Sequence, residues 1–305
     1  MAEPLYVRHG SSVEHDTGLH PEGPGRIPAI EEELARRDWL GYRRVEAPAV
    51  DLDVLERVHP RAHVESVRAM SERGGGAFDP DTTASAGSYN AALHAAGGAC
   101  ALADELLSGA ATAGFCGLRP PGHHAEPTTA MGFCLFNNVA VAAAAAVARG
   151  LSRVAVVDID VHHGNGTQSM FYADPRVLYV SSHQFPFYPG TGAADEVGTG
   201  AGKGFTFNVP LAAGATDADY AAAYRTIAGV LERYAPQLVL VSAGFDAHES
   251  DPLASMRMTT AGYAAVVKSL ADTARRIGCP MALVTEGGYD LDALRACLDA
   301  TLAGI

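Results

Sequence analysis

The chain has 305 residues and a formal net charge of -13. Its length exceeds that of a usual domain, but α/β folds of this size occur as one domain, and no repeat, linker or long charge run divides it. The acidic balance argues against nucleic acid as a partner and is compatible with a cationic substrate.

The sequence also argues against a membrane protein and a disulfide scaffold. The first residues hold no apolar leader, and the one long apolar stretch, 139–148, is too short to span a bilayer, so no membrane partner is expected. The five cysteines are odd in number and show no CxxC spacing, which argues against a disulfide framework or a cysteine zinc knuckle. A reducing, cytoplasmic location is therefore predicted.

The hydrophobic pattern alternates between helices and strands along the chain. Helices are predicted at 29–37, 88–107, 138–148, 217–234 and 260–277. Strands are predicted at 112–116, 154–159, 177–181, 238–242 and 281–285. Such alternation predicts an α/β fold with a mostly parallel sheet and helices on both faces.

Two loops in the first half of the chain carry distinctive residues. Glycines at 74–76 and the polar residues 79–83 after them predict a surface loop. In segment 118–124 (LRPPGHH), two prolines and a glycine stiffen a loop that carries His123 and His124. Adjacent residues of an extended loop point in different directions, so one metal is not expected to take both, and they suggest a pair of acid/base groups.

Segment 153–166 (RVAVVDIDVHHGNG) is the most informative part of the chain. An apolar β-branched run, typical of a buried parallel strand, ends in Asp158, Asp160 and His162. Burying two carboxylates costs several kcal/mol each unless a cation or a hydrogen-bonded histidine compensates, so the segment predicts a divalent-metal site. Taken alone, the triple is also compatible with capping or loop residues at a strand end.

Two later strands end in similar signals. Segment 238–250 (LVLVSAGFDAHES) presents Asp246 after a second apolar run, at the end of a strand where ligands bind in open α/β sheets. Segment 281–290 (MALVTEGGYD) is a strand followed by two glycines and by Tyr289, placed to reach into a cleft.

Together with 20–26 (HPEGPGR) and 131–138 (MGFCLFNN), these segments resemble the zinc-dependent histone deacetylase family. The similarity is strongest to class II members and to their bacterial relatives, the acetylpolyamine amidohydrolases and acetoin-utilisation proteins, and it runs from His20 to Tyr289. It implies the arginase/deacetylase fold, a single α/β catalytic domain over residues 1–305 with a central sheet of about eight parallel strands.

The resemblance implies two cation sites. Asp160, His162 and Asp246 match the zinc ligands, and three protein ligands leave an open position for water and a substrate carbonyl. Two oxygen ligands and one nitrogen would also suit Fe(II) or Co(II). A second site, for K⁺ or Na⁺, would be formed by Asp158, Asp160, His162, Ser181 and Ser182.

The resemblance also assigns catalytic roles. Asp158 would hold His123, which positions and polarises the water, while His124 acts as general base and then acid. Tyr289 would donate to the carbonyl oxygen. Asn165 stands where class I enzymes have an aspartate and would contact His124, whose pKa a neutral amide leaves lower than a carboxylate would.

A narrow tunnel for the aliphatic stem of an acylated amine is implied as well. Phe133 and Tyr188 match its aromatic walls, and Gly132, next to Phe133 in sequence, is a further tunnel residue. Leu253, seven residues after Asp246, would lie near the entrance, where the eukaryotic polyamine deacetylase has a glutamate that pairs with an ammonium group. Leucine cannot make that pair and favours a peptide substrate.

Plainer interpretations stay open for single residues. His123 and His124 could be loop histidines satisfied by backbone carbonyls, as we expect for His163. Phe133 and Tyr188 could be a core residue and a loop aromatic without function, and Leu253 could merely pack its loop.

The predicted function is a zinc-dependent deacetylase acting on acetyl-lysine in peptides or proteins. An acetylpolyamine or other small-amide deacylase is the alternative among enzymes, and a non-catalytic protein that binds acetylated ligands is the alternative from another class. On the tunnel rim, where the family uses a carboxylate to contact the substrate backbone, either Asp79 or Asp81 would supply it. The oligomeric state is not readable from these residues.

Overall fold

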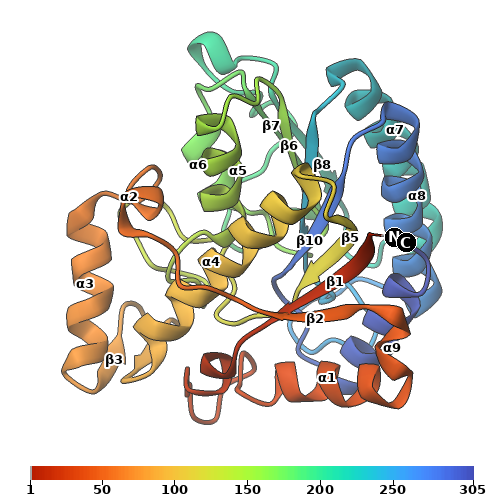
Figure 1. Ribbon diagram of the computed structural model, residues 1–305. Coiled ribbons are helices and arrows are strands. Elements are labelled where there is room, and N and C mark those ends of the chain that lie inside the picture. Colours follow the sequence, from red (N-terminus) through yellow and green to blue (C-terminus); the bar gives the residue numbers. More distant parts are fainter. Residues whose placement is uncertain (1) are drawn as a thin grey trace.

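The computed structural model describes residues 2–305 and is built around one twisted sheet (Figure 1). Eight strands lie in the spatial order β2-β1-β5-β10-β9-β6-β7-β8, and every neighbouring pair is parallel. The strands are β1 (Glu3–Arg8), β2 (Arg43–Glu46), β5 (Ala111–Cys116), β6 (Val154–Asp158), β7 (Val177–Gln184), β8 (Thr206–Leu211), β9 (Leu238–Ala243) and β10 (Met281–Thr285). The predicted α/β fold with about eight parallel strands is confirmed.

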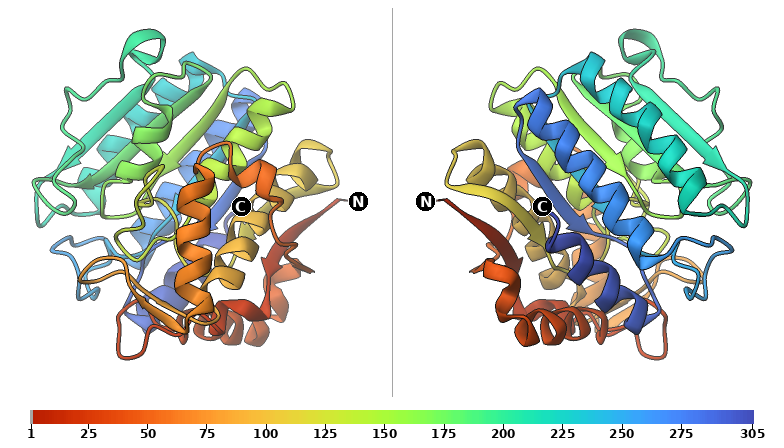
Figure 2. Two further views of the ribbon diagram at one scale, coloured as in Figure 1. Left: turned by 90° about the vertical axis from the view of Figure 1, so that its left-hand side faces the viewer. Right: turned by 90° about the vertical axis from the view of Figure 1, so that its right-hand side faces the viewer.

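Helices cover both faces of the sheet. They are α1 (Arg26–Arg36), α2 (Leu52–Leu55), α3 (Arg61–Glu72), α4 (Ser88–Leu107), α5 (Asn138–Ala148), α6 (Asn165–Phe171), α7 (Asp217–Tyr234), α8 (Thr260–Ile277) and α9 (Leu291–Leu302). One core joins the sheet to α1, α7, α8 and α9, and a second joins its other face to α4 and α5. The right-hand view of Figure 2 looks onto α7, α8 and α9, and the left-hand view onto α3.

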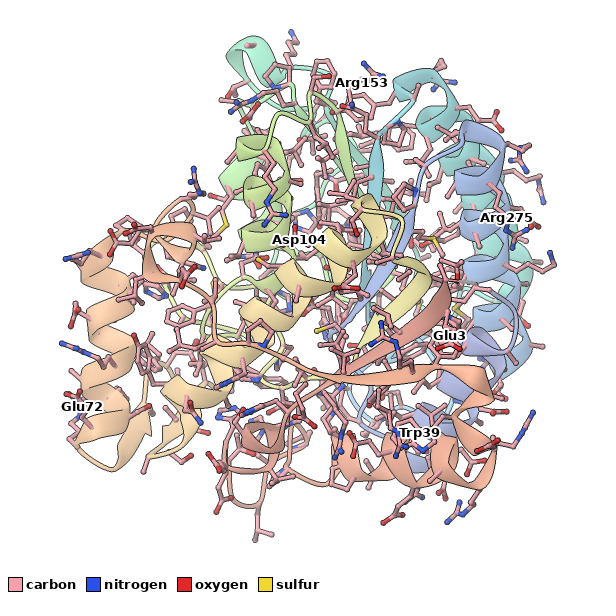
Figure 3. The ribbon with its side chains drawn as sticks, viewed as in Figure 1. Glu3, Trp39, Glu72, Asp104, Arg153 and Arg275 are labelled. Carbon is pink, nitrogen blue, oxygen red and sulfur yellow. The ribbon has the colours of Figure 1, made fainter. Side chains whose placement is uncertain are left out.

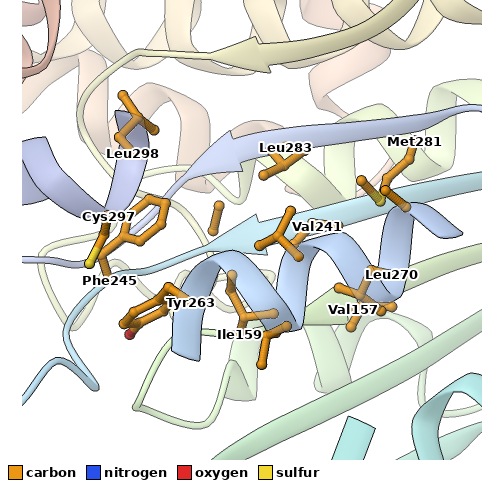
Figure 4. Close-up of a cluster of buried hydrophobic side chains, with 14 of the residues drawn as sticks. Val157, Ile159, Val241, Phe245, Tyr263, Leu270, Met281, Leu283, Cys297 and Leu298 are labelled. Carbon is orange, nitrogen blue, oxygen red and sulfur yellow. The ribbon is translucent and has the colours of Figure 1, made fainter. Parts of the chain in front are cut away.

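The central strands are apolar because both of their faces are covered. Val157 of β6, Val241 of β9 and Leu283 of β10 are partners across the sheet in one continuous row. All three are fully buried and face Leu270 of α8 (Figure 4). Burying each such side chain contributes about 1.5–3 kcal/mol, so this row helps to fix the register of three strands.

Apart from Arg26 of α1, which is buried, the charged side chains of the helices lie mostly on the outside. Figure 3 labels Glu72 of α3 and Arg275 of α8 on opposite sides of the molecule. Over residues 2–305, none of the helices combines the length and apolar character that a membrane crossing requires.

Several elements differ from the sequence-based expectation. Helix α1 begins at Arg26 rather than 29, because a proline is tolerated in the first turn of a helix and Pro28 does not delay it. The expected loop at 74–83 is instead a small antiparallel hairpin of β3 (Gly75–Ala77) and β4 (Thr83–Ser85). Strand β7 runs three residues beyond its predicted end, to Gln184.

The order of the strands determines where the loops of interest meet. The segments singled out above follow β5, β10, β9 and β6, which are consecutive neighbours in the middle of the sheet. The carboxyl ends of parallel strands lie at one edge, so four loops that are far apart in sequence converge there.

Candidate active site

Three potential metal ligands converge at this edge. Asp160 and His162 follow β6, and Asp246 follows β9. Nδ1 of His162 lies 3.1 Å from Oδ1 of Asp160 and 3.0 Å from Oδ2 of Asp246. One ligand atom from each residue lies within 4.8 Å of the others, and all three residues are buried. Two oxygens and one nitrogen are a donor set that zinc binds, and that also suits Fe(II) or Co(II).

Backbone groups hold both carboxylates in place. The N–H of Gly287 donates to Oδ2 of Asp160 at 2.8 Å, and the N–H of Val161 donates to Oδ1 of Asp246 at 2.9 Å. A Cβ atom at Gly287 would overlap both carboxylates, so only glycine permits this approach. The first of the two glycines after β10 thus has a local steric reason.

The charges in this group are strongly coupled. Burial and the neighbouring charge of Asp160 raise the pKa of Asp246 to about 7. Burial lowers the pKa of His162, but its contacts with Asp160 and Asp246 outweigh that effect and raise it to about 10. Two buried carboxylates in contact with one imidazole nitrogen fit the binding of a divalent cation.

The two adjacent histidines lie beside this group. Their rings are 4.0 Å apart, so the expectation that they point in different directions is wrong. The loop is not extended here, because the N–H of Ala125 bonds the carbonyl of Gly122 in a turn. Nδ1 of His123 lies 3.0 Å from Oδ2 of Asp158, and Nδ1 of His124 lies 2.8 Å from Oδ1 of Asn165.

These partners move the two histidine pKa values in opposite directions. Burial lowers the pKa of His123, but the charges of Asp158 and Asp160 outweigh it and raise that pKa well above its usual value. Burial, together with the charges of His123 and His162, lowers the pKa of His124. The two neighbouring rings therefore have pKa values shifted in opposite directions, an arrangement typical of acid/base sites.

A cavity of about 230 Å³ opens onto this site. It is lined by Asp81, His124, Gly132, Phe133, His162, Phe187, Tyr188, Leu253 and Tyr289. The sequence-predicted tunnel residues therefore all lie on one cavity. The Phe133 ring meets the Tyr289 ring edge to face at 5.8 Å, and the Tyr188 ring meets His124 in the same way at 5.2 Å.

The structure distinguishes the two candidate rim carboxylates. Asp81 lies in the turn of the β3–β4 hairpin and lines the cavity. Asp79 instead stabilises that turn, since its Oδ1 accepts hydrogen bonds from the N–H groups of Asp81 and Thr82. Of the two, Asp81 therefore lines the cavity, and Asp79 stabilises the turn.

Tyr289 is held from two sides. Its backbone N–H donates to Oδ2 of Asp251 at 2.7 Å. The guanidinium of Arg26 lies 5.1 Å from the centre of its ring and donates to the carbonyl of Gly288 at 2.8 Å. Burial and the charge of Asp246 raise the pKa of the Tyr289 phenol well above its usual value, so it remains a hydrogen-bond donor.

Sequence reasoning missed three supporting residues. Glu286, fully buried, accepts from the N–H groups of Gly122 and His123 and from Ser242, and burial raises its pKa to about 7. Arg26 makes the contacts described above. The third is Phe187, which stacks on His162 at 5.4 Å. Glu286 could have been found from the sequence, because it is a carboxylate at the end of a buried strand. No local pattern indicates the roles of Arg26 and Phe187.

Two residues of the expected monovalent-cation site are neighbours across the sheet. Asp158 of β6 and Ser181 of β7 are register partners. Oγ of Ser181 lies 2.8 Å from Nδ1 of His183, and Oγ of Ser182 lies 2.9 Å from the Tyr224 hydroxyl. The binding of K⁺ or Na⁺ here stays a prediction.

His163 is held by side chains rather than by the backbone carbonyls expected for it. Its Nδ1 lies 2.8 Å from Oγ1 of Thr191, and its Nε2 lies 2.9 Å from Oε1 of Gln168.

Comparison with known proteins places this arrangement in context. A family model described as histone deacetylase domain matches residues 20–305. Histone deacetylase 15 of Arabidopsis thaliana is 42% identical over 290 residues, covering 93% of this chain and 52% of that protein. Histone deacetylase-like amidohydrolase of Pseudomonas aeruginosa is 46% identical over 248 residues, covering 79% of this chain and 64% of that protein.

Two further matches extend the comparison. A probable deacetylase of Archaeoglobus fulgidus is 36% identical over 292 residues, covering 94% of this chain and 81% of that protein. The crystal structure of the HDA15 HD domain superposes with a TM-score of 0.94 at 38% identity, covering 99% of this chain and 89% of that one. The chain thus spans about half the length of one curated relative and most of another.

Proposed function

The chain belongs to the histone deacetylase domain family, and from this premise we propose that it is a metal-dependent deacetylase of N-acetyl amides, above all of acetyl-lysine in peptides or proteins. The observation that carries the proposal is that His162, His124 and Tyr289 line one cavity. A metal ligand, a neutral base and a protonated phenol then face the same small volume, which is what amide hydrolysis requires.

The metal would be held by Asp160, His162 and Asp246. A zinc ion bound there would polarise the substrate carbonyl and lower the pKa of a water molecule. The glycine at 287 supports this assignment, because it brings a backbone N–H to Asp160 and leaves no side chain beside the carboxylates.

The proton transfers would fall to the histidine pair. His124 accepts the proton of the attacking water at Nε2, since its Nδ1 is engaged by Asn165. It returns a proton to the amine nitrogen as the C–N bond breaks, which yields acetate and the free amine. His123, held at Nδ1 by Asp158, positions and polarises the water.

The phenol of Tyr289 would donate a hydrogen bond to the carbonyl oxygen as negative charge develops on it. Phe133 and Tyr188 would enclose the methylene stem, and Tyr188 is 38% exposed, as a residue at a cavity mouth would be. Leu253 offers an apolar rim, and Asp81 offers an acceptor for a backbone N–H of a bound peptide.

The Asp81 carboxylate also favours a second candidate substrate. A carboxylate at the rim can pair with an ammonium group, and the chain carries a net charge of -13. An acetylpolyamine is therefore the alternative substrate class. A role confined to binding acetylated ligands is less well supported, because it would leave no role for His124 and Tyr289 on the same cavity as His162.

Measurement of the released acid tests the proposal: acetate from acetylated substrates, and the corresponding longer acid from longer acyl-lysine peptides. Purified protein is incubated with acetyl-lysine peptides, acetylspermidine and longer acyl-lysine peptides, with and without a chelator, and its bound metal is analysed. We expect acetate from the peptides at the highest kcat/KM, and loss of turnover with chelator. Binding of acetylated peptide without any released acetate would contradict the proposal, and a tenfold preference for acetylspermidine would move it to the polyamine class.

We propose further that residues 1–305 act as one catalytic domain that also binds K⁺ or Na⁺. A reducing cytoplasm suits the five cysteines, all of which are free thiols.

A further inference from the structure

The amide side chain of Asn165 connects two groups. Its Oδ1 lies 2.8 Å from Nδ1 of His124, and its Nδ2 donates to Oε1 of Glu126 at 2.9 Å. On the same side, Nδ2 lies 3.4 Å from the sulfur of Met131. A chain of contacts therefore runs from Glu126 through Asn165 to His124.

The orientation of this amide decides which nitrogen of His124 carries its proton. An amide oxygen can only accept, so with Oδ1 toward the ring, Nδ1 must be protonated and Nε2 has a free lone pair. If the amide were turned by half a rotation, its NH₂ group would face Nδ1, and the neutral ring would have to carry its proton on Nε2. That tautomer cannot take a proton at Nε2.

The amide itself has no intrinsic preference between these orientations, because its two ends have nearly the same shape. Glu126 supplies the preference. An ionised carboxylate accepts hydrogen bonds and cannot donate one, and the thioether of Met131 is also an acceptor. Only the NH₂ end of Asn165 fits between them, whereas the turned amide would place its oxygen against the carboxylate.

Glu126 is well placed for this role and lies outside the substrate cavity. It starts a tight turn in which its N–H donates to the carbonyl of Thr129 at 3.0 Å. It lies two residues after His124 in the same loop, so its position is tied to that of the base. Its side chain lines a separate surface hollow, shared with Asn165 and Glu196, rather than the cavity lined by Tyr289.

We propose that Glu126 is a positioning residue that fixes the amide orientation of Asn165 and, through it, holds His124 as the Nδ1–H tautomer. The inference rests on the proposed function, in which His124 is the base, and it deepens that function. In this proposal the tautomer of the base is determined by a partly buried carboxylate that lies outside the substrate cavity and does not contact the metal ligands.

Substitutions that reverse hydrogen-bond polarity test the proposal. Glu126→Lys places a donor where Asn165 meets an acceptor, so the amide turns. We expect kcat to fall by about 100-fold or more with KM nearly unchanged, the loss associated with a general base. Glu126→Gln keeps an acceptor oxygen and should retain most of the activity. Glu72→Lys, which makes the same charge change on the outer surface of α3, should leave kcat unchanged.

A double variant distinguishes loss of the Asn165 amide orientation from general damage to the active site. A carboxylate at position 165 presents oxygen on both sides, so Glu126→Lys combined with Asn165→Asp should recover at least tenfold in kcat over Glu126→Lys alone, measured on the plateau of the pH profile. No recovery would contradict the proposal, as would a Glu126→Lys variant with near-normal kcat. If Glu126→Lys does not fold, Glu126→Met removes the acceptor without adding a donor, and should lower kcat several-fold.

The tautomer can be observed without any turnover. In protein with ¹⁵N-labelled histidine, the His124 signals are assigned by their loss in His124→Gln. We expect Nδ1–H in the wild type and in Glu126→Gln, and Nε2–H in Glu126→Lys. An Nδ1–H tautomer in Glu126→Lys would overturn the inference even if the protein were an active deacetylase. Absence of deacetylase activity would overturn only the proposed function.

Discussion

Replacing Asn165 by aspartate should move the acidic limb of the rate profile to higher pH. The amide oxygen lies 2.8 Å from Nδ1 of His124, so Asn165→Asp puts a full negative charge where a neutral dipole now lies. The charge favours the imidazolium and raises the pKa of His124. Because His124 must be neutral to accept a proton, the variant needs a higher pH to reach the same rate.

The size of the effect follows from the contact. Two unit charges about 4 Å apart interact by about 4 kcal/mol at an effective dielectric constant of about 20, which corresponds to a pKa change of about three. Part of this effect is opposed by Glu126. In the wild type Nδ2 of Asn165 donates to Glu126, whereas in the variant two carboxylates would repel each other there. We therefore expect the limb to move by about one to two pH units.

The assay is kcat/KM for an acetyl-lysine peptide across the pH range over which the metal stays bound. Asn90→Asp, an exposed residue of α4 with the same change in net charge, is the matched control and should leave the limb in place. An unchanged acidic limb in Asn165→Asp would show that the contact between residues 124 and 165 does not set it.

Three other substitutions address the metal, the phenol and the rim. Asp246→Ala should abolish both bound metal and turnover, and full metal occupancy in that variant would remove Asp246 from the ligand set. Tyr289→Phe should keep fold and metal but lose roughly 10²–10³ in kcat, the loss typical of one oxyanion donor; a near-normal rate would mean that another group supplies the hydrogen bond. Leu253→Glu should raise kcat/KM for acetylspermidine relative to acetyl-lysine peptide by the equivalent of ~1–3 kcal/mol, one ion pair, and an unchanged ratio would place Leu253 outside substrate recognition.

Prediction from the sequence was most successful where a structural feature depends on residues that are close together in the chain. Strand β6 is apolar up to its last residue, Asp158, and Asp160 and His162 follow it, so the strand and the metal site could be predicted from the same segment. The capped helix α8 was predicted to the residue, because the N-cap Thr259 and the left-handed Gly278 mark its ends.

Strands β1, β2 and β8 and helices α2, α3, α6 and α9 were not predicted. Strand β2 (RRVE) lies at the edge of the sheet and is largely exposed, so it has no apolar run to reveal it. The role of Arg26 depends on contacts with Glu286 and Gly288, some 260 residues away in the chain. A local pattern shows that a residue is charged, but it does not show what that residue meets across the fold.

The metal ligands lie in separate sequence motifs, and the register of the central strands brings them together. Asp158 of β6 pairs with Ser242 of β9, and the next loops bring Asp160 and Asp246 together. A slip of β6 by one residue against β9 would turn Val157 away from α8 toward the opposite face. It would also move the ligands about 3.3 Å apart along the strand, beyond the tolerance of a metal site. The apolar row that stabilises the core therefore also aligns the ligands, and a variant that shortens Val157 or Val241 should lower metal affinity as well as stability.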